Sequence, residues 1–401
     1  MKPMKKTLAA LAALCLLCAT TTVPAAAAAD GTALRYSAGG AFRILVFTDT
    51  HQHNADYPEM TAFIGEAIDY AKPDLVVFDG DNVAGSACEN AATELAAITK
   101  ILTPVVERGV PFAFVYGNHD QEYHPGGKDG RAEMMAMYQS FPGCLAYDAL
   151  GDGKSVFSLP VYSGADAAKV VSNLWFFDSG QSAPAGYELG GYDWVHKDQI
   201  DWYTAESEAL EAQAGAKVPS LAFQHIPVPE TCEVYAAMPF EIPGLTLTVL
   251  GTPRLLLPNL LKFDGVIMER VSPPFYSDGQ FDAWVRRGDV VAAIFGHDHA
   301  NDFTTRVRGI DLVGCPSTTF YTDGADVNRG ATLFTLDENN PWSYAKQGVG
   351  YRQVAGQPGS QIGRTRSDDG RYYQFWALYL LERVGQALLW PVKAVLRTLG
   401  I

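Results

Sequence analysis

Side chains that can bind metals follow short apolar runs at five places in this chain. They are Asp49 with His51, Asp81, Asn118 with His119, His225, and His297 with His299. Carboxylate, amide and imidazole groups without thiolates suit Mn²⁺, Fe or Zn²⁺, and this set is too large for one ion. The residues therefore predict a pair of metal ions that clamps a phosphoryl group, with the Asp81 carboxylate as a candidate bridge between them.

The last of these places, IFGHDHANDF at 294–303, puts two imidazoles one residue apart. On extended backbone, side chains two positions apart point to the same side. His297 and His299 would then both face the site, while Asp298 would point away from it. We expect the two histidines to serve neighbouring metal ions and Asp298 to matter less than either.

Buried strands are needed to carry these groups to one place. Continuous apolar runs bounded by polar or glycine-rich turns are typical of strands buried on both faces. Such runs occur at 43–48, 74–78, 111–116, 174–177, 220–223 and 290–295. Apolar stripes with helical periodicity lie between them, formed by Phe63, Ile64, Ala67, Ile68 and Ala71 and by Leu95, Ile98, Leu102, Val105 and Val106. This alternation predicts an α/β fold whose functional groups lie beyond the carboxyl ends of the strands.

The order of the motifs resembles that of the calcineurin-like metallophosphoesterases. The matching blocks are Asp49-x-His51, Gly80-Asp81-Asn82, Gly117-Asn118-His119-Asp120, His225 and Gly296-His297-Asp298-His299, within roughly residues 42–334. Two further segments, GYDWVHKDQIDWY from Gly191 and GHDHANDF from Gly296, resemble the branch that contains yeast and plant purple-acid-phosphatase-like phosphatases and secreted bacterial relatives.

The resemblance implies a four-layer α/β/β/α sandwich as a catalytic domain over 40–350, and it implies a role for each matching residue. The first metal would take Asp49, His51, Asp81 and His299, and the second would take Asp81, Asn118, His225 and His297. His119 matches the histidine that contacts phosphate and protonates the leaving alkoxide, with Asp120 orienting it. Asn118 would also contact substrate. His53, close to the first block, is either a further substrate contact or a solvated loop histidine.

One departure from the purple acid phosphatases concerns the metal. Those enzymes carry a metal-binding tyrosine a few residues after the bridging aspartate, whereas this chain continues DNVAG, with Ala84 where an aromatic residue would be needed. A coloured Fe(III)-tyrosinate centre is therefore not expected.

These roles predict an enzyme that hydrolyses phosphate monoesters of small substrates. A hydroxide that bridges two divalent metal ions would attack phosphorus, and His119 would assist departure of the alcohol. A phosphodiesterase or nucleotidase with the same site is the alternative. A non-catalytic, metal-containing surface protein is the contrasting class.

The first 29 residues have the charged, apolar and small-residue order of a secretory signal peptide. The alternative is a membrane anchor, but a spanning helix needs roughly 20 apolar residues and the run from Leu8 to Cys18 is shorter. We therefore expect cleavage after Ala29 and a mature protein that is secreted or associated with the cell surface.

The chain is acidic, with a formal net charge of -15 that becomes -18 when Lys2, Lys5 and Lys6 leave with the signal. An acidic body repels a polyphosphate backbone at long range, which argues against a nucleic-acid partner but not against a small phosphorylated substrate held by metals. Four of the six cysteines remain after cleavage, namely Cys88, Cys144, Cys232 and Cys315. Their wide scatter shows no disulfide framework, so one or two disulfides and free buried thiols are both open.

Two segments have the composition of connections. Residues 239–263 are rich in leucine but broken by proline and glycine, which suits either a packed hairpin with extra core or a partly apolar lid over the site. Residues 351–370 have the composition of a linker.

The C-terminal residues 371–401 predict an amphipathic helical tail. Glu382, Gln386, Lys393 and Arg397 share one helical face, opposite a wide apolar arc. Such a helix suits a membrane interface, where the tail would make the enzyme membrane-associated. The alternative is that the tail docks on its own domain or on a second subunit.

Overall fold

The computed structural model describes residues 33–53, 58–122, 130–237, 247–249, 252–254, 256–362 and 372–398. The predicted signal peptide at 1–29 lies outside the described residues.

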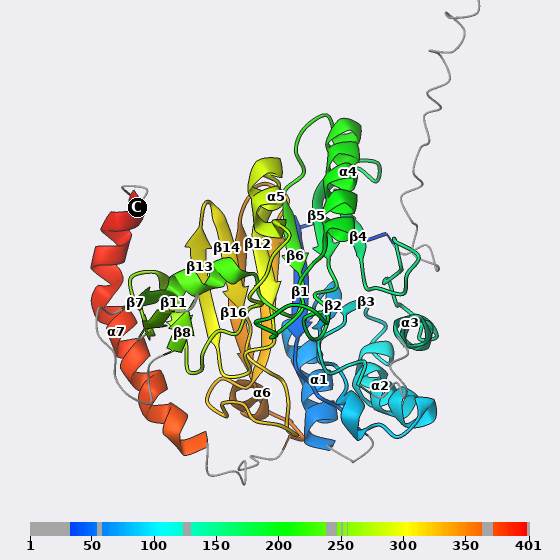
Figure 1. Cartoon of the computed structure of the whole chain (residues 1–401). Coiled ribbons are helices and arrows are strands. Elements are labelled where there is room, and N and C mark those ends of the chain that lie inside the picture. The colour runs from blue at the N-terminus through cyan, green and yellow to red at the C-terminus, as the bar shows by residue number, and fades with distance from the viewer. Residues whose placement is uncertain are drawn as a thin grey trace, which may run out of the picture.

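Two sheets form the centre of the molecule (Figure 1). The first has the order β16 (Tyr344–Gly350), β15 (Gly330–Asp337), β1 (Ala41–Phe47), β2 (Leu75–Asp79) and β3 (Phe112–Val115). The second has the order β11 (Phe263–Val266), β13 (Asp302–Val307), β14 (Ile310–Gly314), β12 (Val290–Phe295), β6 (Ser220–Phe223), β5 (Val170–Phe176) and β4 (Phe157–Tyr162). In the first sheet β1, β2 and β3 are parallel, and in the second β5, β6, β12 and β14 are parallel. The carboxyl ends of the parallel strands therefore supply one loop-bearing edge in each sheet.

Helices cover the outer faces of the two sheets. Those on the first sheet are α1 (Pro58–Ala71), α2 (Ala91–Val106), α3 (Arg131–Gln139) and α6 (Tyr351–Ala355), and those on the second are α4 (Lys197–Ala214) and α5 (Gln280–Arg287). One core cluster joins the first sheet to α1 and α2 and to the facing side of the second sheet, where Phe176 stacks on Phe157 and Phe223. Trp175, on the other side of β5, belongs to a second cluster with α4 and α5. The predicted four-layer α/β/β/α sandwich is confirmed.

The predicted strands all form because their runs are buried on both faces. Ser220–Phe223 and Val290–Phe295 coincide with β6 and β12, and the other four differ by a few residues at their ends. The predicted helical stripe on α2 is wrong in one position. Leu95 is 37% exposed, because the buried face of α2 passes through Ala97, Ile98 and Ile101 instead.

The predicted linker over 351–370 differs in its described part. Tyr351 and Val354 of α6 are buried, and the Oγ of Ser360 donates to Glu66 of α1 at 2.5 Å. These residues pack on the catalytic domain, so a linker could start only later, and 363–370 lie outside the described residues.

The described parts of 239–263 contain short strands. β8 (Leu247–Val249) pairs with β9 (Thr252–Arg254), and β10 (Leu256–Pro258) pairs with β7 (Tyr235–Ala237), which follows the 3₁₀ turn η2 (Pro229–Val234). The hairpin pairing is present, and a lid stays a prediction. All four cysteines outside the predicted signal are free thiols.

The predicted helical tail is confirmed as α7 (Tyr372–Thr398), which lies along the β11 side of the second sheet, at the left in Figure 1. Across the described part of the chain, no helix has both the length and the apolar character that a transmembrane span requires.

Candidate metal centre

Five loops meet where the carboxyl ends of the parallel strands of the two sheets face each other. Asp49 follows β1, Asp81 follows β2, Asn118 follows β3, His225 follows β6 and His297 follows β12. Backbone hydrogen bonds join neighbouring loops: Asp49 N donates to Gly80 O at 3.0 Å, and Gly296 N donates to His225 O at 3.2 Å. The strand-end residues predicted from the sequence are thus gathered in one place.

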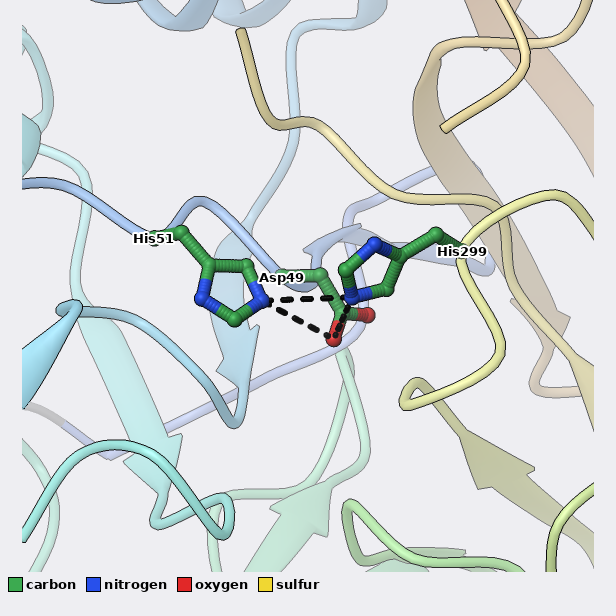
Figure 2. A group of neighbouring side chains, drawn as sticks. All are labelled: Asp49, His51 and His299. Atoms are coloured by element: carbon green, nitrogen blue, oxygen red, sulfur yellow. Dashed lines mark hydrogen bonds and ion pairs between the residues drawn. The ribbon is translucent and has the colours of Figure 1, made fainter. Parts of the chain in front are cut away.

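Six of these side chains form two groups of three. One group is Asp49, His51 and His299, and the other is Asp81, His225 and His297; within each group the candidate ligand atoms lie within 4.8 Å of one another. Figure 2 shows the first group, with all three polar ends turned toward one another. The Nε2 atom of His299 lies 3.3 Å from Asp49 Oδ1 and 3.2 Å from the Nε2 atom of His51.

The two groups are in contact through their carboxylates. Asp81 Oδ2 lies 3.1 Å from His225 Nε2 in its own group and 3.6 Å from His51 Nε2 in the other. Asp49 Oδ1 likewise lies 3.6 Å from His225 Nε2. Asp81 Oδ2 and Asp49 Oδ1 thus each lie within 3.6 Å of histidines from both groups, and a bridging role for Asp81 stays a prediction.

Several atoms at this place are buried without a hydrogen bond. They are Asp49 Oδ1, Asn118 Oδ1, His225 Nε2 and His297 Nε2, for which the described residues provide no hydrogen-bond partner. Leaving a buried polar group unsatisfied costs about 1–3 kcal/mol, and more for a charged group. Because all four atoms are metal-ligand types, two divalent ions would satisfy them, and the donor set fits the predicted metal pair.

The remaining polar atoms of the ligands are fixed by the protein. His225 Nδ1 donates to Asp79 O at 2.9 Å, and His299 Nδ1 donates to Asp323 O at 2.6 Å, which leaves each Nε2 turned to the site. On Asp81, the other oxygen Oδ1 accepts the amide of His119 at 2.7 Å. Such hydrogen bonds behind the ligands set the tautomer of each imidazole and the direction of each ligand atom.

The backbone carries strain at the ligands. Asp49, His51, Asp81 and His297 have φ values of 50°, 43°, 48° and 71°, the left-handed region that non-glycine residues rarely adopt. Each such conformation costs on the order of 1–3 kcal/mol and persists only where the surroundings enforce it. Strain concentrated on four metal-ligand candidates is typical of a functional site.

This strain corrects one prediction. His297 is not on extended backbone, because the amide of Asp298 donates to Gly296 O at 2.8 Å and turns the chain sharply. The two histidines nevertheless reach different groups. Asp298 points away, as expected, and accepts the amide of Ser272 at 3.1 Å.

Two glycines leave room for ligands from other strands. A Cβ atom on Gly117 would lie 2.2 Å from both N and Oδ1 of Asp81. A Cβ atom on Gly296 would lie 1.8 Å from Thr48 Oγ1 and 2.8 Å from Asp49 Oδ2. These distances are shorter than any contact between non-bonded atoms. The close approach of the loops therefore depends on glycine at both positions.

His119 stands beside the first group, with its ring centre 5.3 Å from that of His51. Its side chain is 44% exposed, and its Nδ1 donates to Glu122 Oε1 at 2.7 Å. The predicted orienting role of Asp120 is wrong, because the buried Asp120 carboxylate accepts the amides of Val83 and Gly117 instead. Glu122 was missed by the sequence analysis, although an acid three residues after a candidate catalytic histidine is a usable signal.

The other residues at the site are placed as follows. Asn118 has its Oδ1 among the unsatisfied buried atoms, and its carbonyl accepts Gln181 Nε2 at 3.3 Å. The ring of His53 packs on Tyr321 at 4.1 Å, so its predicted substrate contact stays a prediction. Tyr192, which the sequence analysis missed, packs edge-on against the ring of His297 at 4.3 Å.

Burial and neighbouring charges set the protonation of the ligands. Burial would raise the pKa of the Asp49 carboxyl, but the imidazoles of His225 and His299 lower it to about 2. Burial lowers the pKa of His297 to about 3. Burial also acts to lower the pKa of His225, yet the carboxylates of Asp81 and Asp49 raise it to about 10. Asp49 and His297 are therefore in the forms that bind a metal, and His225 must release a proton to do so.

Residues 42–301 match the family model described as "Calcineurin-like phosphoesterase". A protein of Arabidopsis thaliana named "Probable inactive purple acid phosphatase 29" is 30% identical over 334 residues, covering 75% of this chain and 76% of its own. "Phosphatase DCR2" of Saccharomyces cerevisiae is 29% identical over 258 residues, covering 62% of this chain and 40% of its own. Among solved structures, a dimetal phosphatase from Danio rerio aligns with a TM-score of 0.48 at 13% identity, over 77% of this chain and 96% of that one.

Proposed function

The chain belongs to the calcineurin-like phosphoesterase family, and on this premise we propose that it hydrolyses the phosphate monoesters of small molecules at the two ligand groups. Membership makes it a phosphoester hydrolase; the monoester substrate and the assignment of residues are the proposal. The observation that carries it is the pair of ligand groups joined through Asp81, whose Oδ2 is within 3.6 Å of histidines from both.

Two divalent ions bound there would activate water as the nucleophile and neutralise the oxygens of the phosphoryl group. Asp49, His51 and His299 would hold one ion, and Asn118, His225 and His297 would hold the other, with Asp81 shared. Oxygen and imidazole ligands suit Mn²⁺, Fe or Zn²⁺. Ala84 is buried after the bridging residue and has no atom that could replace a ligand tyrosine.

His119 supplies the proton that the leaving group needs. Because its Nδ1 proton is held by Glu122, the proton transferred to the leaving alkoxide oxygen comes from Nε2. The Glu122 carboxylate fixes the direction of the ring and stabilises its protonated form, as an acid partner does in other histidine-assisted reactions. The exposed ring edge of His119 is open to a substrate.

Charge favours a monoester over a diester. Two divalent cations carry more positive charge than the carboxylates of Asp49 and Asp81 cancel, and the positive excess attracts the doubly charged phosphate of a monoester more strongly than the singly charged phosphate of a diester. A phosphodiesterase or nucleotidase with the same site remains the alternative.

A non-catalytic role is the second candidate, because the name of the Arabidopsis relative describes that protein as inactive. The six side chains of the two ligand groups, the bridging position of Asp81 and the pairing of His119 with Glu122 all support turnover in this chain.

Hydrolysis of p-nitrophenyl phosphate and bis(p-nitrophenyl) phosphate with added Mn²⁺ tests the proposal. We expect the monoester to be the better substrate and Asp81→Asn to reduce its turnover to background. Asp298→Asn is the matched control, since Asp298 lies on the same edge but bonds to Ser272 instead of joining a ligand group. Two bound metal ions per chain with no hydrolysis of either ester would establish the binding role instead.

We also propose that the enzyme works outside the cytoplasm. The support is the order of charged, apolar and small residues in 1–29. Sequencing the N-terminus of the protein recovered from the producing cells should find Asp30 first. A mature chain that retains 1–29 would contradict export with cleavage.

A further inference from the structure

Helix α7 binds its own domain through its polar side. Glu382 and Lys393 are only 6% and 4% exposed. The Glu382 carboxylate accepts the amide of Ile267 at 2.6 Å, and Lys393 Nζ donates to Phe263 O and to Asp264 Oδ1. The polar residues that the sequence analysis placed opposite the apolar arc are therefore the residues that attach the helix to β11 and the residue after it.

The opposite side of α7 is an apolar surface that faces solvent. We define its outer face by Leu380, Leu381, Val384, Leu388, Val392 and Val395, whose exposed fractions lie between 47% and 74%. Their spacing repeats every three or four residues, which keeps them on one side of a helix. In Figure 1 this helix lies at the periphery, with no described element beyond it.

Some of the other exposed apolar residues stand on separate segments of the chain. Trp342 and Leu189, for example, are 50% and 58% exposed but belong to separate loops. Isolated apolar residues on a surface need no explanation, whereas a contiguous set marks an interaction site. The outer face of α7 is therefore a candidate contact surface.

Positive charge accompanies this surface in an otherwise acidic protein. A cavity of about 790 Å³ lies between the C-terminal half of α7 and β11, β13 and β14. Five cations line it, Lys262, Arg306, Arg308, Lys393 and Arg397, against two acids, Asp264 and Asp311. Arg306 pairs with Asp311, Lys393 and Arg397 share Asp264, and Arg308 pairs with Asp282 outside the lining, so the cations still outnumber their acid partners by five to three. The one acid in the α7 sequence, Glu382, is turned inward. An anionic partner would therefore meet no exposed carboxylate of α7, although the whole chain has a net charge of -15.

We propose that the outer face of α7 lies in the surface of a membrane that contains anionic phospholipid, with headgroup phosphates beside the cation-lined cavity. A helix parallel to the membrane buries its apolar side among the headgroups and upper acyl chains while nearby cations attract anionic lipid. Trp390 of α7, 65% exposed, is a residue type that favours this interface. A second copy of the chain is the other occupant that could cover the apolar residues, and the experiments below distinguish it from lipid.

Flotation of residues 30–401 with lipid vesicles tests the apolar contact. We expect the protein to float with vesicles that contain phosphatidylglycerol and to float much less with phosphatidylcholine alone. Leu381→Glu with Leu388→Glu places two charges in the outer face and should lower the partition coefficient about tenfold or more. Trp342→Glu, a comparable change at an exposed residue on the turn before β16, is the matched control and should float as the unaltered protein does.

A second set of variants tests the contact between the cations of the cavity and anionic lipid. Lys262→Gln with Arg306→Gln should lower partitioning onto the anionic vesicles by about fivefold per charge removed, and added salt should remove this difference. Arg286→Gln on α5, outside the cavity, is the control for the loss of a surface charge. These changes leave α7 itself unaltered, so they stay informative if the glutamate variants misfold.

Three outcomes would overturn the proposal. One is that Leu381→Glu with Leu388→Glu floats as well as the Trp342→Glu control. Another is that the unaltered protein binds neutral and anionic vesicles equally. The third is a dimer, seen by light scattering, that the glutamate variant dissociates in a protein that does not float, since this would identify a second copy as the occupant. Hydrolysis of p-nitrophenyl phosphate in solution should be the same for all these variants, because none of the changed residues belongs to the metal centre.

Discussion

Two acidic residues, Asp120 and Glu122, follow His119 in the chain. In the structure the side chain of His119 is hydrogen-bonded to Glu122, the more distant of the two in sequence. Glu122 accepts a hydrogen bond from His119 Nδ1, while Asp120 is buried and accepts hydrogen bonds from two backbone amides. Under the proposed mechanism, changes at the two acids should therefore differ: Glu122 would orient His119 as the proton donor, whereas Asp120 holds the loop.

Replacing Glu122 by glutamine should lower kcat about 10- to 100-fold with little change in KM, because the imidazole loses the charge that orients and stabilises its protonated form. Steady-state kinetics on p-nitrophenyl phosphate measure kcat and KM separately. Glu122→Asp should recover part of the loss, since it keeps the charge on a shorter side chain.

The contrasting variant is Asp120→Ala, which should cost about 1–3 kcal/mol of unfolding free energy by leaving the amides of Val83 and Gly117 unsatisfied. Urea unfolding at saturating metal separates this effect from catalysis. If Glu122→Gln destabilised the protein and left kcat unchanged, the orienting role of Glu122 would be refuted.

Alanine variants of the two histidines after β12 should each lose a different metal ion. His299→Ala should weaken the ion held with Asp49 and His51, and His297→Ala should weaken the ion held with Asp81 and His225. Metal analysis after dialysis should find one ion retained by each variant and both retained by Asp298→Asn. Loss of both ions from either histidine variant alone would mean that the groups do not bind independently.

The ligand residues could be predicted because each is of a metal-binding type directly after a buried run. The partner of His119 could not, because Asp120 and Glu122 differ only in how the loop turns them. The left-handed backbone of His297 could not be predicted either, since only a few per cent of non-glycine residues adopt that conformation, even though histidine is among the enriched types.

Among the structural elements, the loops of the site depend on how closely neighbouring strands bring them together. Gly117→Ala would place a methyl group 2.2 Å from the backbone and carboxylate of Asp81, and this carboxylate must move. We expect loss of bound metal and of activity while the circular dichroism spectrum is retained. Gly348→Ala in β16, where a Cβ would meet no atom within 4 Å, should leave both unchanged.

The docking of α7 should weaken as the pH rises. Burial raises the pKa of Glu382 from 4.5 to about 7, against the opposing effect of its hydrogen bond from Ile267. A raised carboxyl pKa means that the folded state binds the proton more tightly, so the contribution to stability is complete below about pH 4.5 and is lost as the pH passes 7.

Glu382→Gln tests this directly, because glutamine keeps an acceptor for Ile267 and cannot ionise. The advantage of the variant in melting temperature over the unaltered protein should grow as the pH rises from 5.5 to about 7 and level off toward pH 8. A constant difference across that range would show that Glu382 does not titrate there.

Strands were predictable as elements because burial on both faces leaves a continuous apolar run. The orientation of α7 was not, although its amphipathic pattern was plain. Periodicity shows that polar and apolar residues lie on opposite sides of a helix, but not which side meets the protein. Here two buried hydrogen bonds decide it, one that Glu382 accepts from Ile267 and one that Lys393 donates to Phe263.

For the whole molecule, metal binding and folding should be coupled. Buried ligand atoms such as Asp49 Oδ1 and His297 Nε2 have no hydrogen-bond partner among the described residues, so the metal-free protein carries their desolvation cost. Two ions at about 100 times their dissociation constants would add on the order of 5 kcal/mol. Chelation should therefore lower the melting temperature by roughly 10 °C.

Calorimetry with and without a chelator measures this shift, and restoring Mn²⁺ should reverse it. The Asp81→Asn protein is the control and should respond much less to chelation. If the melting temperature of the unaltered protein did not change with the chelator, tight binding of metal ions at these groups would be contradicted.

The attachment of α7 has a consequence for what the enzyme can reach. Glu382 holds Ile267, and the next residues, Met268 and Glu269, donate to Asn301 Oδ1, two positions beyond the ligand His299. Three consecutive residues, 267–269, thus connect the helix by hydrogen bonds to the loop that carries His299. With α7 resting on lipid, the reaction centre would sit at a constant height above the bilayer, and a tethered substrate would be cleaved only if its phosphate extends to that height. The enzyme would then select membrane-bound substrates by length as well as by chemistry.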